Sequence, residues 1–499
     1  MRAALSRGPL VRSVRASAAS LRQLAYADPA TFPVLLDSSA LGPLGRYSIL
    51  AAYPQGALWV DRNTLHADVN IASHNGAPAG GFLDAFQLAW RSAAAAEAVT
   101  AAAAAAAGAA ALQVAAPGAP GPFRGGWMLF LAYELAAEIE PRLALPQPAR
   151  DADPGPAAFA LRIPAAVVFD HQAGQAWLVA EPGRPELLTA LAEALASVAG
   201  LPVPGESAAG LQVPVLTEEA PERFRARVEA ALEYIRAGDI YQANLSRPWR
   251  AEFAGAIEPG TAAALYEALR TANPAPFAAL AQYRGWSLLC SSPERLVRVA
   301  DGRVDTRPIA GTRPRSRRPG EDARELAALI AHPKERAEHV MLVDLERNDL
   351  GRICRAGSVR ADPMMITESY AHVHHIVSNV SGQLRPGLTP VDVLRAVFPG
   401  GTITGCPKFR CMQIIAELEG EARGAYTGAI GFINHDGSLD FNILIRSLTL
   451  AGEQLEFRAG GGIVADSDWQ RELAETRAKA HGLLAALQSP AELQASAPV

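Results

Sequence analysis

The order of helix and strand patterns in the C-terminal half of the chain constrains the fold most strongly. Amphipathic patterns at 221–238 and 333–350 predict two helices, each bounded by a glycine. Segments 286–292 and 439–450 have the composition of strands, and the pair Asp301–Gly302 predicts a hairpin turn. No regular series of strand, helix and parallel strand is present. We therefore predict an α+β fold with antiparallel sheets rather than a doubly wound parallel sheet.

The composition excludes several classes of protein. Of 499 residues, 49% are hydrophobic and 19% are charged, and the net charge is -5. This balance is typical of a folded globular chain, and the lack of a basic excess argues against nucleic-acid binding. Four cysteines without a CxxC pair argue against a disulfide scaffold or a zinc site and favour the reducing cytoplasm. No strongly apolar run is long enough to cross a membrane.

Composition also divides the chain near residue 205. The N-terminal region, 1–205, contains an Ala-rich insert at about 92–121, and a Pro/Gly/Ser-rich linker leads to a C-terminal region, 215–490. Residues 1–27 hold five Arg and no acidic residue, as in a mitochondrial presequence. We favour an unselected Ala/Arg-rich tail instead.

Two predicted helices each carry a Glu-x-x-Glu pattern. Glu335 and Glu338 share one face of the first, and Glu472, Glu475 and Lys479 share a face of the second. Carboxylates from two helices would supply the oxygen ligands that Mg²⁺ prefers. The same spacing also occurs on solvated helix surfaces, where Glu475 and Lys479 would form a surface ion pair. The spacing alone therefore leaves open whether these residues bind a metal or face solvent.

Glycines and a buried cation favour a small anionic ligand. Gly460, Gly461 and Gly462 follow a predicted strand and precede a helix that Ser467 is expected to cap, so their N–H groups can approach an anion. Neither they nor the loop FPGGTITGCPK match a nucleotide-binding loop, although plain turns remain an alternative. Arg446 interrupts an apolar strand pattern and should meet a carboxylate of the protein or of a ligand.

Several long blocks occur in order through the C-terminal region: GDIYQANLSR, SSPERLV, TRPIAGTRPR, ERAEHVMLVDLERNDLGRIC, FPGGTITGCPKFRCMQIIAELE, GAYTGAIGF and GGGIVADSDWQRELAETRAKA. Weaker blocks in the N-terminal region are LLDSS, GRYSILAAYP and GGWMLFLAYELAAEIEP. Together they resemble the chorismate-utilising enzymes, and most closely component I of aminodeoxychorismate synthase. The Ala-rich insert has no counterpart in this pattern.

The resemblance implies a four-layer α/β/β/α body with two large, mainly antiparallel sheets, chorismate as substrate and Mg²⁺ as cofactor. It implies that Glu338 and Glu475 are the principal Mg²⁺ ligands, with Glu335 and Glu472 close by. Glu294 would be the acid that helps the C4 hydroxyl leave. The other matching positions are the active-site His375, the carboxylate-binding Arg446, Gly460, Gly461, Gly462 and Lys479, and the pocket-lining Tyr426 and Thr402.

Two positions discriminate between branches of this family. Members that add water need a Lys where this chain has Gln242, and a Gln cannot act as a base, so an ammonia user is favoured. Ala310 stands where many aminodeoxychorismate synthases carry a nucleophilic Lys and anthranilate synthases carry Ala. The blocks DLERNDLGR and YQANLSR match the aminodeoxychorismate branch, and LLDSS weakens the case for tryptophan feedback.

We therefore predict Mg²⁺-dependent amination of chorismate to 4-amino-4-deoxychorismate for 4-aminobenzoate and folate synthesis. Anthranilate synthase component I is the alternative. No cysteine lies in a glutaminase-type GxCxG turn, so the resemblance implies a separate glutaminase subunit that supplies ammonia. A non-catalytic small-acid-binding homologue is a further alternative, but Glu294 argues against it because a binding module needs no general acid.

Overall fold

The computed structural model describes residues 8–40, 42, 44–69, 80–106, 121–148, 155–203, 215–253, 255, 257, 260–316, 318–369 and 373–487. Part of the Ala-rich insert, most of the linker before residue 215 and the first residues of the Arg-rich segment lie outside these ranges. No described helix is both long and apolar enough to cross a membrane.

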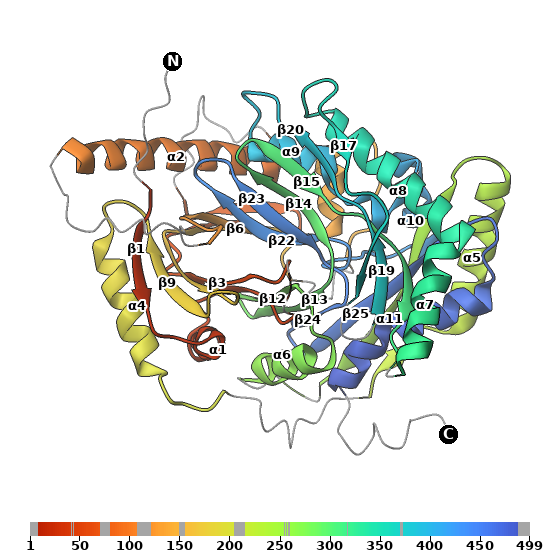
Figure 1. The fold of residues 1–499 in the computed structure, drawn as a ribbon, viewed down its shortest axis with the longest axis horizontal. Coiled ribbons are helices and arrows are strands. Elements are labelled where there is room, and N and C mark those ends of the chain that lie inside the picture. The colour runs from red at the N-terminus through yellow and green to blue at the C-terminus, as the bar shows by residue number, and fades with distance from the viewer. Residues whose placement is uncertain are drawn as a thin grey trace.

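Two large antiparallel sheets form the centre of the molecule (Figure 1). Among the described residues, the twelve-stranded sheet has the order β1 (Leu10–Val14), β9 (Gln175–Ala180), β8 (Ala165–Asp170), β3 (Tyr47–Ala52), β2 (Val34–Asp37), β12 (Phe277–Tyr283), β13 (Trp286–Ser292), β24 (Ser447–Ala451), β25 (Gln454–Ile463), β11 (Gln242–Glu252) and β10 (Thr217–Glu218), with β21 (Gly405–Cys406) beside β11.

The ten-stranded sheet has the order β17 (Arg360–Ala361), β20 (Val380–Gln383), β15 (Arg303–Thr306), β14 (Arg295–Ala300), β23 (Leu439–Ile443), β22 (Ala429–Asn434), β6 (Gly126–Leu131), β7 (Ala158–Ile163), β4 (Ala57–Asp61) and β5 (Thr64–Ala67). A small third sheet joins β16 (Ile309–Pro314), β19 (Val373–Val377) and β18 (Ile366–Ser369). Strands from both sides of residue 205 pair directly, β2 with β12 and β6 with β22, so both regions build each large sheet.

Three apolar clusters define four layers. One cluster, with Ile49, Phe130 and Leu288, lies between the two sheets. A second packs α1 (Ala18–Ala27), α4 (Pro185–Ser197), α6 (Thr261–Ala272) and α11 (Trp469–Leu487) on the outer face of the twelve-stranded sheet. A third packs α2 (Phe82–Ala106), α3 (Ala136–Ile139), α8 (Pro333–Gly351) and α9 (Pro390–Val397) on the ten-stranded sheet. The predicted four-layer α+β fold is confirmed.

The remaining helices gather at one end of the molecule, where α5 (Pro221–Arg236), α10 (Lys408–Glu419) and α11 surround β11 through a cluster that contains Phe224, Leu245 and Ile415. In Figure 1 this end also carries α8 and α7 (Pro319–Ala331). Two short turns of 3₁₀ helix, η1 (Tyr133–Leu135) and η2 (Gly401–Ile403), complete the description. The helices predicted at 221–238 and 333–350 are confirmed as α5 and α8.

The prediction of one continuous strand over 439–450 is wrong. β23 belongs to the ten-stranded sheet and β24 to the twelve-stranded sheet, so the chain passes between the layers at Leu444–Arg446. Arg446 takes a left-handed conformation there, with φ of 52°. The sequence concealed this break because both strands are apolar, although Leu439, Phe441 and Ile443 pack in the outer cluster of the ten-stranded sheet and Leu448 and Leu450 in that of the twelve-stranded sheet.

Two details at the C-terminal end also differ from expectation. The three glycines lie inside β25 rather than after it, because each pairs with a residue of β11. Asp468 rather than Ser467 caps α11, accepting the Arg471 N–H at 3.1 Å, whereas Ser467 donates its hydroxyl to Glu472 at 2.6 Å.

Candidate active site

The glycine segment of β25 forms the floor of the candidate site. Gly460, Gly461 and Gly462 pair with Ser246, Leu245 and Asn244 of β11. A methyl group on Gly462 would collide with the amide of Gln242. The same methyl would lie 3.4 Å from Glu338, and one on Gly461 would lie 3.4 Å from a carboxylate oxygen of each of Glu472 and Glu475. The absence of side chains therefore lets functional groups approach the strand backbone closely.

The acidic residues come from two helices that meet at this strand. α8 supplies Glu338, which lies beside Gly462, and α11 supplies Glu472 and Glu475, which lie beside Gly461. Consecutive residues of a strand point to opposite faces, so the two helices approach β25 from different sides, and the charges of Glu338 and Glu475 both raise the pKa of Lys479. Glu335 lies against Gly311 instead, where a methyl group would be 3.0 Å from its Oε2. In the described part of the chain, no three His, Cys, Asp or Glu side chains are arranged to hold a metal by themselves.

Lys479 connects the acidic cluster to the glycine strand. Its Nζ lies 2.7 Å from Glu475 Oε1 and donates to the Gly460 carbonyl at 3.0 Å. Burial lowers the pKa of Lys479, but the charge and hydrogen bond of Glu475 outweigh it, and the net pKa is raised. The side chains of Lys479 and Glu475 are 40% and 48% exposed, so this ion pair is accessible to a small molecule.

Glu294 is a buried acid between β13 and β14, with 6% of its surface exposed. Thr402, on η2, donates its hydroxyl to Glu294 Oε1 at 2.7 Å. Burial raises the pKa of Glu294 to about 7, and the Thr402 hydrogen bond and the charges of Lys479 and Arg446 act in the opposite direction. A carboxyl group with this pKa can donate a proton near neutral pH.

Arg446 and His375 face the same surroundings. Burial lowers the pKa of Arg446. The negative charge of Glu294 acts in the opposite direction. Burial, followed by the positive charge of Arg446, lowers the pKa of His375 to about 4, so the imidazole is neutral at pH 7. Arg446 therefore lies near both Glu294 and His375, and its guanidinium makes no ion pair within the described structure.

Residue 310 lies beside His375. Ala310 is on β16 opposite Ile376 of β19, and Thr312, after a bulge, is opposite His375. Ala310 is buried, with 6% of its surface exposed. The position predicted to discriminate between branches thus lies on the strand that pairs with the strand of His375.

Tyr426 and two amide side chains border the glycines on one side. A methyl group on Gly460 would lie 2.7 Å from Tyr426 Oη and 3.1 Å from Asn244 Oδ1. Gln242 donates its Nε2–H to Glu338 Oε1 at 3.0 Å. Within the described ranges, neither Gln242 Oε1 nor Asn244 Oδ1 accepts a hydrogen bond. Sequence reasoning missed Asn244, although its spacing of two from Gln242 places both on one face of the strand.

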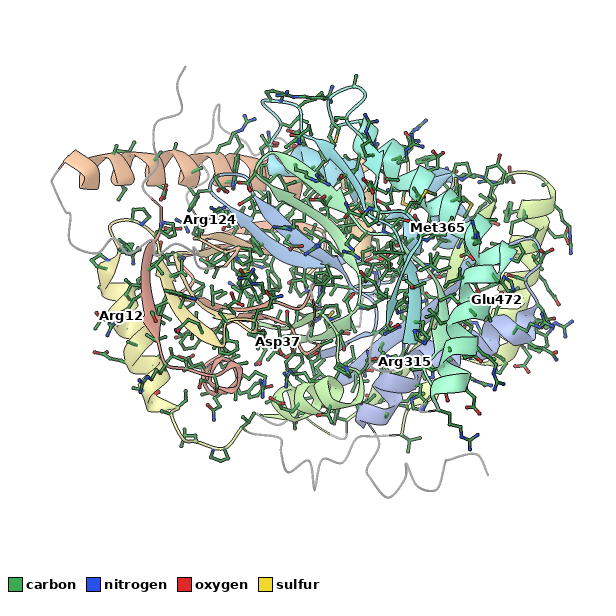
Figure 2. The ribbon with its side chains drawn as sticks, in the orientation of Figure 1. Arg12, Asp37, Arg124, Arg315, Met365 and Glu472 are labelled. Carbon is green, nitrogen blue, oxygen red and sulfur yellow. The ribbon has the colours of Figure 1, made fainter. Side chains whose placement is uncertain are left out.

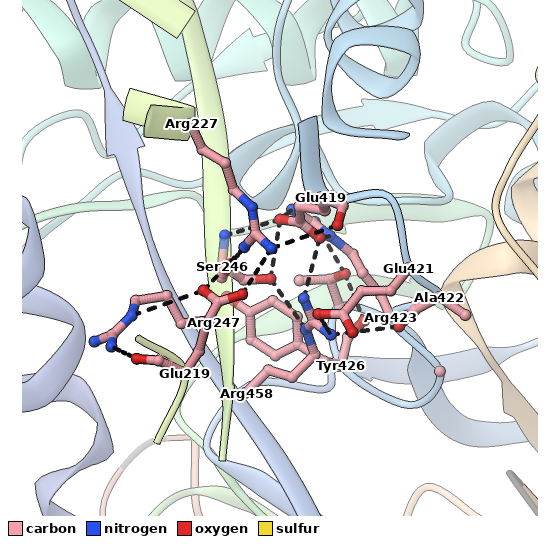
Figure 3. A network of polar contacts seen from close by, with 12 residues as sticks. Glu219, Arg227, Ser246, Arg247, Glu419, Glu421, Ala422, Arg423, Tyr426 and Arg458 are labelled. Carbon is pink, nitrogen blue, oxygen red and sulfur yellow. Dashed lines mark hydrogen bonds and ion pairs between the residues drawn. The ribbon is translucent and has the colours of Figure 1, made fainter. Parts of the chain in front are cut away.

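A buried charge network supports this part of the site (Figure 3). Glu419 accepts hydrogen bonds from Arg423 at 2.7 Å and from the N–H and hydroxyl of Ser246 at 2.8 and 3.0 Å. Arg458 lies 3.4 Å from the same carboxylate. The guanidinium of Arg423 is 5.6 Å from the ring centroid of Tyr426. The network thus joins β11, β25 and the Tyr426 turn, and nothing in the sequence patterns had indicated it.

A separate cavity of about 330 Å³ lies between the sheets, lined by Asp37 and Ser38 of the LLDSS segment and by Tyr47, Phe277 and Arg295 among others. It contains none of the predicted site residues. Figure 2 shows Asp37 near the middle of the molecule and Glu472 at the end formed by the α8 and α11 helices.

Comparison with known proteins identifies the class. The chorismate binding enzyme family matches residues 64–485, so the chain belongs to this family and is a chorismate-utilising enzyme. Its relatives include an anthranilate synthase component I-like protein of Synechocystis (42% identical over 369 residues, 74% of this chain and 73% of the relative) and aminodeoxychorismate synthase component 1 of Bacillus subtilis (41% over 376 residues, 73% and 77%).

The solved structure of anthranilate synthase component I from Streptococcus pneumoniae superposes with a TM-score of 0.70 at 31% identity, covering 89% of this chain and 93% of that one. The resemblance seen in the sequence motifs is therefore confirmed at the level of the family. Relatives of both branches are present among these matches.

Proposed function

We propose that the chain transfers ammonia to chorismate and forms 4-amino-4-deoxychorismate. The observation that carries this proposal is the amide of Gln242, which is bound to Glu338 at 3.0 Å and stands where water-adding members need a base. The unpaired oxygens of Gln242 and Asn244 are acceptors suited to ammonia, which donates hydrogen bonds. The segments YQANLSR and DLERNDLGR favour the 4-amino product.

Cationic and backbone groups would bind the two carboxylates of chorismate. Arg446, Lys479 and the N–H groups of the glycine segment supply them, and charge-assisted hydrogen bonds of this kind are strong. Arg446 has no ion-pair partner in the described structure and is therefore available to the substrate.

Glu338 and Glu475 are the residues that would hold Mg²⁺. Their carboxylates come from two helices at one strand, which suits an ion that takes one or two carboxylates and leaves other positions to water and substrate. When bound, the ion would neutralise the ring carboxylate of the substrate. Glu472, beside Gly461, would support these ligands, whereas Glu335 lies beside Gly311.

Glu294 would be the general acid. As the nitrogen of ammonia bonds to the ring, the C4–O bond breaks, and the Glu294 proton leaves with the hydroxyl group as water. The new ammonium group then releases a proton to solvent and Glu294 takes one up again, so chorismate and ammonia give the amine and water. His375, neutral at pH 7, would orient the substrate without adding charge.

Ala310 offers no nucleophile, so ammonia would attack the ring directly and another group would direct it to C4. The same alanine and the anthranilate synthase relatives favour the second candidate, amination at C2 with loss of pyruvate. A separate glutaminase subunit would supply ammonia in the reducing cytoplasm, and free ammonia at high pH would replace it.

Incubation with chorismate, Mg²⁺ and ammonia, followed by product identification, tests the proposal. A product that an added lyase converts to 4-aminobenzoate supports it. Fluorescent anthranilate and pyruvate without any lyase would instead establish the second candidate. No turnover under either condition would favour a non-catalytic chorismate-binding protein.

A further inference from the structure

Glu346 is a buried carboxyl group to which the proposed mechanism assigns no role. It lies on α8 two turns beyond Glu338 and is the middle acid of DLERND, with 4% of its surface exposed. Its Oε2 accepts the hydroxyl of Thr306 at 3.0 Å, and its Oε1 accepts the N–H of Gly401 at 3.3 Å.

These contacts connect Glu346 to the proposed acid. Gly401 and Thr402 are consecutive residues of η2, and Thr402 donates to Glu294 at 2.7 Å. Glu346 and Glu294 thus hold neighbouring residues of one short turn. Since one residue of backbone and a threonine side chain span about 7 Å, the two carboxylates lie at most about 13 Å apart.

The charged groups around each carboxyl differ. Asp349 and Lys408, which form an ion pair with each other, face Glu346. Lys479 and Arg446 face Glu294. Burial raises the pKa of each carboxyl to about 7, and the negative charge of Glu346 further raises that of Glu294.

We propose that Glu346 is a positioning residue: through the Gly401 N–H it fixes η2, and with it the Thr402 hydroxyl, against Glu294, and its negative charge opposes the ionisation of Glu294. This inference rests on the proposed role of Glu294 as the acid. The ionisation of one carboxyl group then depends on the charge of the other, so the two titrate as a coupled pair rather than as independent sites.

Infrared difference titration of the protonated carboxyl band tests the pairing without requiring turnover. The band of Glu294 is assigned by its loss in Glu294→Gln. In Glu346→Gln, which keeps the size of the side chain but removes its charge, the titration midpoint of Glu294 should fall by about half to one pH unit, the effect of one charge at about 13 Å in an effective dielectric of about 20.

Glu134→Gln is the matched control. Burial raises the pKa of Glu134 to about 7 as well, but it accepts N–H groups of Arg423 and Gly424 rather than of η2. Its substitution should leave the Glu294 midpoint unchanged. Thr306→Val provides a second test. Without the Thr306 hydrogen bond, Glu346 keeps its proton to higher pH and carries less negative charge. The Glu294 midpoint should therefore fall, but by less than in Glu346→Gln.

A Glu294 midpoint unchanged in folded Glu346→Gln would overturn the inference. Where chorismate turns over, the alkaline limb of the kcat profile of Glu346→Gln, measured at constant ammonia, should move to lower pH with the Glu294 midpoint while KM stays unchanged. A purely structural role would instead lower kcat equally at all pH values. A shifted midpoint without chorismate turnover would reject the proposed function but retain the pairing.

Discussion

Replacing Glu294 by Gln should remove the acid without disturbing its surroundings. The amide oxygen of Gln can still accept the Thr402 hydrogen bond, which is 2.7 Å long in the native chain, but the amide cannot supply a proton of comparable acidity. A general acid typically accelerates its reaction by about 10²–10⁴-fold, so kcat should fall by that factor. KM for chorismate should change little because Arg446 and Lys479 remain.

The pH dependence provides the sharper part of this prediction. With a pKa of about 7, Glu294 is about 90% protonated at pH 6 and about 10% at pH 8, so kcat of the native chain should fall about tenfold over this interval. The variant should lose this dependence. Chorismate consumption at saturating substrate and constant concentration of unprotonated ammonia measures both effects.

Thr402→Val is the companion variant. The Thr402 hydrogen bond lowers the pKa of Glu294, so its loss should move the alkaline limb to higher pH. If Glu294→Gln instead raised KM strongly and kept kcat and its pH profile, Glu294 would only bind substrate, and the assignment of an acid would be wrong.

Three further predictions concern the metal, the substrate and the scaffold. Glu338→Gln or Glu475→Gln should abolish turnover with an unchanged Tm, and added Mg²⁺ should no longer restore the activity of the chelator-treated variant. Turnover above about one-tenth of the native value would exclude the substituted residue as a ligand. Arg446→Gln should raise KM at least about tenfold without lowering Tm, since its buried charge lacks an ion pair in the described structure; an unchanged KM would refute its role. Glu419→Gln should destabilise the fold by about 3–5 kcal/mol in denaturant titrations, because buried Arg423 loses its counter-charge while Arg458 keeps Glu421 and Glu456. The pKa of Glu419 is lowered in the folded state, so the native carboxylate stabilises above the unfolded pKa and this contribution disappears as pH falls through the folded value.

The fold class could be predicted because local patterns and the fold agree along most of the C-terminal region. The helix α5 and the hairpin of β14 and β15 follow directly from periodicity and turn chemistry. The passage between sheets at Arg446 could not be predicted, since β23 and β24 are equally apolar although they belong to different layers. Periodicity reports which face of a strand is buried, not which sheet the strand joins.

Within the site, the residues with recognisable chemistry were easier to find than those that support them. Motif resemblance indicated Glu294, Lys479 and Arg446, and in the structure the charges of Lys479 and Arg446 both lower the pKa of Glu294. Asn244, Glu346 and Glu419 were missed because each owes its importance to burial against residues distant in sequence. Isolated polar residues in a strand or helix are ordinarily solvated, and only the three-dimensional contacts distinguish these from that majority.

The contacts of Glu346 also explain why the branch signals in the sequence conflict. The segments that mark the two branches are not independent. Glu346 of DLERND accepts the hydroxyl of Thr306, the last residue of β15, and β16 begins three residues later at Ile309. Ala310 follows on β16 and adjoins the strand of His375. A change at either segment therefore acts on the adjoining strands β15, β16 and β19, and neighbouring residues of this kind do not contribute additively. Under the proposed function, we therefore expect residue 310 and the packing of α8 on this strand pair to act together in directing ammonia to C2 or C4.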